Sequence, residues 1–146
     1  MWYRKKLAEL NVEDFYQILK LRIDTFVVEQ ERIYHELDDK DLAALHIFHK
    51  NASGQVDAYA RLFEENEHLV FGRVVTAQAA RGQGLGGRLI EQILEEAARE
   101  SKDIHIEAQE QVVALYEKYG FEAVGEPFIF ESTPHLAMIY QQKTKK

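Results

Sequence analysis

A glycine-rich segment in the second half of the chain has the composition best suited to binding a phosphate. It reads Arg81-Gly82-Gln83-Gly84-Leu85-Gly86-Gly87 and contains four of the chain's eight glycines. Glycine lets a backbone turn tightly and approach a ligand closely. From Leu85 onward, apolar residues recur at three- and four-residue spacing, which predicts a helix. The unpaired N–H groups of its first turn and the helix dipole would favour a phosphate or pyrophosphate.

Other interpretations of this segment differ in how well they fit. A P-loop is excluded because no Lys-Ser/Thr pair follows the glycines. Gly82, Gly84 and Gly87 fit a dinucleotide fingerprint, and Glu107 lies 20 residues further on. However, five residues separate the preceding strand from Gly82, and too few residues follow for further parallel units. A strand–helix turn without a ligand remains an alternative.

The overall composition limits the partners and the chemistry. The chain has 146 residues, a net charge of −7 and no cysteine. It therefore has no thiolate nucleophile, disulfide or Cys-bound metal. The negative charge argues against nucleic acid, and no apolar run is long enough to span a membrane. We expect one cytoplasmic domain over residues 1–146 that binds no metal, because His46 and His49 point to opposite faces of a strand.

The acidic residues are unevenly distributed along the chain. Residues 68–90 contain no acid but three arginines, Arg73, Arg81 and Arg88, which favours an anionic ligand there. Six acids gather between Glu29 and Asp41. We interpret this acidic run as a solvated loop, with attraction of a cationic amine as the alternative.

The hydrophobic pattern predicts an α/β (α+β) fold. Asn11 is the expected N-cap of one long helix or two broken ones, and Gly120 is expected to end a short helix. The longest helix follows the glycines and joins two parallel strands. We therefore expect a mixed, mostly antiparallel sheet of six to seven strands with helices on both faces and a central parallel β-α-β crossover. The expected strands are 2–7, 45–50, 55–63, 68–76, 104–109, 128–131 and 135–141.

Two motifs together resemble the GNAT N-acetyltransferase superfamily. Arg81, Gly84 and Gly86 match the signature R/Q-x-x-G-x-G/A, and residues 115–121 (LYEKYGF) match a Y-x-x-x-G-F segment. A helix and a strand separate the motifs, as in that family, and the likeness covers nearly the whole chain. Shorter matches, such as residues 26–30 and Pro134-His135, resemble its ElaA-like branch.

The resemblance implies acetyl-CoA as acetyl donor and an amine as acceptor. Acetyl-CoA would lie where the strand ending at Thr76 and the strand around Ile106 diverge. The first of these strands would pair with pantetheine through its backbone, and the glycine segment would hold the pyrophosphate. The positive charge of Arg88 would lie nearby. The implied cofactor-binding residues are Val74, Val75, Thr76, Arg81, Gly82, Gln83, Gly84, Leu85, Gly86 and Gly87.

The resemblance also implies the catalytic groups. Tyr116 matches the general acid that protonates the departing thiolate, although a packed aromatic residue is the structural alternative. The base is open: the ElaA-like matches favour Glu29 and His135, while Glu107 and His105 are further candidates.

The absence of cysteine leaves direct attack by the amine as the route of transfer. The competing functions are a non-catalytic acyl-CoA-binding or regulatory module and, more remotely, an NAD(P)-binding enzyme. A homodimer is one option for the oligomeric state.

Overall fold

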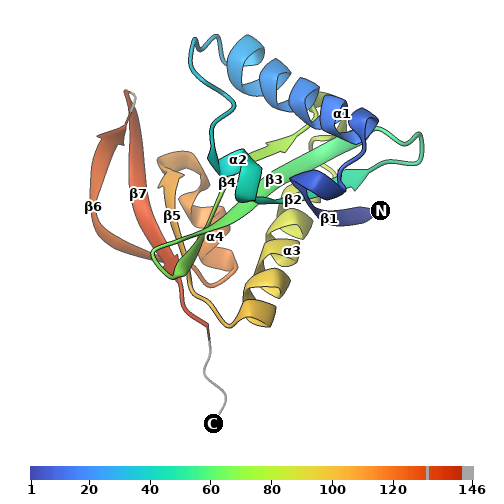
Figure 1. Ribbon diagram of the computed structural model, residues 1–146. Helices are drawn as coiled ribbons and strands as arrows, with labels where there is room; N and C mark the ends of the chain where they lie inside the picture. The colour runs from blue at the N-terminus through green and yellow to red at the C-terminus, as the bar shows by residue number, and fades with distance from the viewer. Residues whose placement is uncertain (131, 143–146) are drawn as a thin grey trace. The chain divides into compact units, whose positions relative to one another are not determined.

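The computed structural model describes residues 1–130 and 132–142 (Figure 1). Its strands follow the order β1-β2-β3-β4-β5-β7-β6 in a seven-stranded sheet, and both parallel and antiparallel pairs occur. The predicted mixed sheet is therefore confirmed. The chain divides into two compact units, Met1–Phe63 with Gly72–Ile93, and Glu64–Phe71 with the chain from Leu94 onward. A single domain over residues 1–146 stays a prediction.

The first unit contains β1 (Trp2–Lys6), β2 (Leu45–Lys50) and most of β3 (Val56–Glu65). It also holds the second half of β4 (His68–Thr76). Strands β1, β2 and β3 pair in antiparallel fashion, in agreement with the mostly antiparallel sheet that was predicted. Consecutive residues of β2 and β3 are buried, and consecutive side chains of a strand point to opposite faces. Both faces of these strands must therefore be covered by helices.

Helices supply both covers of the first unit. The Asn11 side chain accepts a hydrogen bond from the N–H of Asp14 (2.7 Å), which caps α1 (Val12–Ile23) as predicted. The chain continues without a break into a π-helical turn, Asp24–Glu29. Ile18 and Leu21 pack on Phe48 and Tyr59. Figure 1 shows α1 on one face of these strands and the start of α3 (Leu85–Glu100) on the other.

The acidic run differs from the expected solvated loop. A short helix, α2 (Lys40–Ala43), begins within it. Glu36 and Asp41 are buried, with exposed fractions of 5% and 7%. Their carboxylates bind arginine side chains, which is why these acids turn inward instead of remaining in water.

The second unit is built on β5 (Ile104–Gln109), β6 (Glu122–Phe130) and β7 (Thr133–Tyr140). The start of β4 pairs in parallel with β5 at Leu69 opposite Ile104. Strand β7 pairs in antiparallel fashion with both β5 and β6. The parallel crossover through α3 was therefore predicted correctly.

Strand β6 begins six residues earlier than predicted. The register of β6 on β7 shifts between Val124 and Phe128, and Gly125 adopts a φ of +78° within that shift. Gly125 and Pro127 are turn residues by type, so they concealed the first half of the strand from the pattern. Glu131, the predicted end of this strand, lies outside the described residues.

The short helix α4 (Val113–Lys118) follows a 3₁₀ turn, and Gly120 ends it with a φ of +97°. A Cβ at Gly120 would lie 3.1 Å from the Tyr140 ring, so both conformation and space call for glycine. The predicted C-terminal glycine is thus confirmed. Within the described part of the chain, no helix is long and apolar enough to cross a membrane.

Candidate functional site

The glycine segment forms the connection between β4 and α3. Gly82 and Gly84 have φ values of +83° and +78°, a region that favours glycine. The Arg88 N–H donates to the Gly84 carbonyl (3.2 Å) as α3 begins. The N–H groups of residues 85–87 come before this bond and have no helical acceptor among the described residues. A Cβ built at Gly82, Gly84 or Gly86 meets no atom within 4 Å. The segment therefore offers free donors beside open space.

Arg81 connects this segment to two other predicted site residues. Its Nε donates to the Thr76 carbonyl at the end of β4 (3.2 Å). Its two terminal nitrogens each lie 3.1 Å from a carboxylate oxygen of Glu29. Both side chains of this ion pair are 42% exposed, so its contribution to stability is at most about 1 kcal/mol. The structure thus brings Glu29, Arg81 and Thr76 together, with both oxygens of Glu29 occupied.

The end of β4 presents the backbone predicted to pair with pantetheine. Val75 is buried in the core beneath α1, while Val74 and Thr76 are half-buried. Within β4, the backbone adopts a left-handed conformation at Arg73, with a φ of +52°. A residue other than glycine is strained there by about 1–2 kcal/mol. The Arg73 side chain offsets this strain by binding Glu36.

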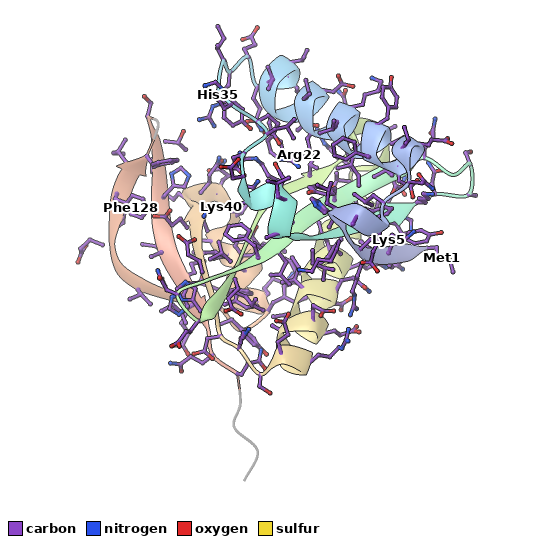
Figure 2. The ribbon with its side chains drawn as sticks, viewed as in Figure 1. Met1, Lys5, Arg22, His35, Lys40 and Phe128 are labelled. Carbon is purple, nitrogen blue, oxygen red and sulfur yellow. The ribbon has the colours of Figure 1, made fainter. Side chains whose placement is uncertain are left out.

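Glu36 belongs to a buried ion cluster that the sequence analysis did not anticipate. Its centre is Arg22 of α1, which is 1% exposed (Figure 2). The guanidinium donates to Glu36 Oε2 (2.6 Å) and to both oxygens of Asp41 (2.8 and 3.2 Å). A buried cation is tolerated only when its donors are satisfied in this way. The cluster therefore fixes the segment between the π-helical turn and α2 against α1.

Two further arginines extend the ion cluster. Arg61 binds both oxygens of Asp38 (2.7 and 3.0 Å) and Asp41 Oδ1 (3.0 Å). Burial opposes ionisation of Asp41, but hydrogen bonds and charge from Arg22 outweigh it and lower its pKa to about 2. Arg61 likewise lowers the pKa of Asp38. The positive charges of the three arginines balance the negative charges of the three carboxylates. The ion cluster comprises Arg22, Glu36, Asp38, Asp41, Arg61 and Arg73.

The two histidines of β2 lie on opposite faces, as predicted. His46 Nε2 donates to the Asp41 carbonyl (3.1 Å), so its Nδ1 accepts from the Tyr59 hydroxyl (2.7 Å). Burial lowers the pKa of His46. His49 Nδ1 instead bonds Asp57 Oδ1 (2.7 Å). No group of three or more potential metal ligands occurs within residues 1–130 and 132–142.

Tyr116 of α4 belongs to the second unit. It is 7% exposed, and its ring packs against Phe71 and Phe121. Burial raises the pKa of its hydroxyl to about 12, so the hydroxyl stays protonated at neutral pH. It has no hydrogen-bond partner elsewhere in the described chain. Tyr116 is therefore a protonated donor held in an aromatic setting.

His135 of β7 also lies in the second unit. Its Nδ1 is 2.8 Å from the Thr133 carbonyl, which can only accept, so Nδ1 carries the proton of the neutral ring. The lone pair is then on Nε2, which has no partner among the described residues. The Phe128 and Phe130 rings lie 6.0 and 5.6 Å from the imidazole. In the neutral ring, this tautomer leaves Nε2 as a hydrogen-bond acceptor.

Tyr116 and His135 lie on opposite faces of the second unit's strands. Phe121, which packs on Tyr116, also packs on Tyr140. Tyr140 and His135 are five residues apart on one strand, and an odd separation places side chains on opposite faces. The structure thus places these two predicted catalytic side chains on the two faces of the same strands.

The other base candidates lie on β5. His105 stacks on His68 with ring centroids 3.7 Å apart. Burial and, to a smaller extent, the charge of His68 lower the pKa of His105. Glu107 is exposed on the same face of the strand. Strand alternation places both on the face of His135, because Gln109 pairs with His135 in the register.

The strands form a mixed sheet, a glycine segment opens the long helix α3, and a tyrosine lies on the next short helix, α4. Together these features define a class of acyl-transferring proteins. The sequence profile of the Acetyltransferase (GNAT) domain family matches residues 8–142. The chain therefore belongs to the GNAT acetyltransferase family, and the resemblance inferred from the motifs is confirmed.

Two solved structures place the chain more closely. An acyl-CoA N-acyltransferase from Pseudomonas aeruginosa is 38% identical, with a TM-score of 0.89 over 96% of this chain and 98% of that one. ElaA from Escherichia coli is 31% identical, with a TM-score of 0.89 over 97% and 99% of the two chains. The chain thus lies in the ElaA-like branch.

A more distant neighbour is an aminoglycoside 6'-N-acetyltransferase whose structure is a complex with coenzyme A. It is 12% identical, with a TM-score of 0.76 over 100% of this chain and 99% of that one. At this identity the likeness shows a shared fold.

Proposed function

We propose that this protein is an acetyl-CoA-dependent N-acetyltransferase that transfers the acetyl group to an amine by direct attack. The observation that carries the proposal is the glycine segment, where free N–H groups of a helix's first turn face open space. Such a site suits the pyrophosphate of coenzyme A. The coenzyme A complex of a neighbour with the same fold supports this. Residues 1–146 would act as one catalytic domain, in the cytoplasm where acetyl-CoA is available.

The proposed transfer assigns a task to each predicted group. Backbone groups of Val74–Thr76 pair with the pantetheine arm, and Gly82–Gly87 hold the pyrophosphate. The amine nitrogen forms a bond to the thioester carbon, and the carbon–sulfur bond breaks. Tyr116 donates its proton to the departing sulfur, which requires the hydroxyl to be protonated at neutral pH. The amine's proton passes to a base.

Of the two favoured bases, His135 fits the task better. Its tautomer leaves Nε2 able to accept a proton. Glu29 instead has both carboxylate oxygens on Arg81, which in turn binds the end of β4. We therefore assign proton acceptance to His135. Glu29 acts as a positioning residue that orients Arg81 beside the pyrophosphate segment.

A substitution at Gly86 tests the proposed pyrophosphate site. Gly86→Leu should leave the thermal midpoint unchanged or higher, because a Cβ there meets no protein atom and leucine favours a helix. The dissociation constant for acetyl-CoA, measured by calorimetry, should rise roughly tenfold or more because the side chain fills the space beside the donors. Gly86→Ala is the matched control and should bind normally.

The same titration separates the competing functions. Unchanged acetyl-CoA affinity in Gly86→Leu would place the pyrophosphate elsewhere. Binding without acetylation of any amine would favour a non-catalytic acyl-CoA-binding module. A thermal shift with NADH but none with acetyl-CoA would contradict the proposal.

Separate measurement of kcat and KM distinguishes the two bases. His135→Gln should lower kcat/KM by about 10²-fold, mainly through kcat, since the glutamine amide cannot accept the amine's proton. Glu29→Gln should raise the KM for acetyl-CoA more than it lowers kcat. The reverse pattern would identify Glu29 as the base.

A further inference from the structure

We propose that the acceptor is a small primary amine carried on an aromatic or branched apolar group, which packs against Phe128 and Phe130 beside His135. This inference rests on the proposed function and specifies its substrate class. The residues that carry it all belong to the second unit and to the hairpin of β6 and β7. We refer to Phe128, Phe130 and His135 together as the aromatic face.

The geometry of the hairpin defines this face. Phe128 lies directly opposite His135 in the register, so their side chains project from the same side of the sheet. Phe130, two residues further along β6, projects from that side too and meets the imidazole edge-on. Figure 2 labels Phe128 on this hairpin. An amine delivered to His135 would therefore meet the two phenyl rings that contact the imidazole.

The face is apolar and is exposed to solvent at Phe130. Phe130 is 54% exposed, so an apolar partner can cover its ring, whereas His135 itself is only 9% exposed. The lone pair of His135 without a protein partner lies beside these rings. A highly hydroxylated acceptor such as an amino sugar would lose hydrogen bonds to water against phenyl rings. An apolar body on the amine would instead gain by leaving water.

The charge of the hairpin favours an amine over other ligands. Residues 119–142 include three glutamates and no lysine or arginine. Of these acids, Glu122 and Glu126 are exposed on β6. A negative surface attracts the ammonium form that predominates in solution, and aromatic faces also bind cations. The same charge disfavours phosphorylated or carboxylate-rich acceptors.

The test compares two amines that differ in the apolar group. For the wild-type protein, kcat/KM for 2-phenylethylamine should exceed that for ethylamine by at least about tenfold. In Phe130→Ala this ratio should fall about fivefold or more, chiefly through KM for 2-phenylethylamine. Ile129→Ala is the matched control, because Ile129 is 69% exposed on the same strand but on its opposite side. It should keep the wild-type ratio.

Several results would overturn this inference. A wild-type ratio near one, or a ratio that Phe130→Ala leaves unchanged, would show that the aromatic face does not select the acceptor. A change from dimer to monomer in Phe130→Ala, with the ratio preserved, would show that a second copy covers the face. Failure to bind acetyl-CoA would contradict the proposed function instead. If no amine turns over, an NMR titration of 2-phenylethylamine with coenzyme A present still tests the face, and absent binding overturns it.

Discussion

Replacing Tyr116 with phenylalanine is expected to lower kcat by about 10²-fold or more, the usual contribution of a positioned general acid. The variant keeps the ring that packs against Phe71 and Phe121, so its thermal midpoint should change little. Because burial raises the Tyr116 pKa to about 12, this hydroxyl should produce no alkaline limb in the wild-type profile below pH 11. Single-turnover rates with a saturating amine measure the effect on the chemical step.

Tyr119 provides the matched control for this prediction. It lies one helical turn further along and is less buried than Tyr116. Tyr119→Phe should leave turnover unchanged. Equal turnover in wild type and Tyr116→Phe across the pH range would show that Tyr116 is not the general acid.

The largest expected effect on stability comes from Arg22→Met. Removing this guanidinium leaves the buried carboxylates of Glu36 and Asp41 without their main partner. Breaking a buried pair from one side lowers the free energy of unfolding by about 3–5 kcal/mol. Urea denaturation at pH 7 measures the change. Lys20→Met is the control on the same helix, because the Lys20–Asp24 pair is exposed and should contribute less than about 1 kcal/mol.

The difference in stability between wild type and Arg22→Met should depend on pH. The pKa of Asp41 is about 2 in the folded protein and about 3.9 in an unfolded chain. The ionised carboxylate therefore contributes stability that is fully present above pH 5 and is lost as the pH falls towards 2. The difference should shrink over that window. A constant difference down to pH 2 would mean that Arg22 acts by packing alone.

Much of the fold could be predicted from the sequence because each element carries its own local signal. Asn11 and Gly120 are found at a helix start and a helix end by residue type alone. The glycines before α3 interrupt two strongly periodic segments. Strand β6 lacked such a signal, since Gly125 and Pro127 lie inside it and resemble a turn.

The ion cluster escaped prediction because its partners are distant in sequence. Arg22 follows Ile18 by four residues and precedes Phe26 by four, so it occupies the apolar stripe of α1. That position was the available signal for a buried arginine. Nothing local identifies Glu36 and Asp41 as its partners, because the pairing depends on how a loop folds back.

The choice between Glu29 and His135 as the base also escaped prediction, because it depends on contacts that form only when the chain folds. Glu29 and His135 both fit by residue type. They differ in their surroundings: Arg81 occupies one, and the Thr133 carbonyl sets the tautomer of the other. Neither contact follows from hydrophobic periodicity or from motif spacing.

The role of Glu36 has a consequence for how this branch of the family diverges. Its carboxylate connects Arg22 of α1 with Arg73, whose left-handed backbone precedes the end of β4. A single replacement at any of the three positions leaves a buried charge unmatched or a strained backbone unsupported. We therefore expect positions 22, 36 and 73 to covary among homologues, with apolar residues at 22 and 36 accompanied by glycine at 73.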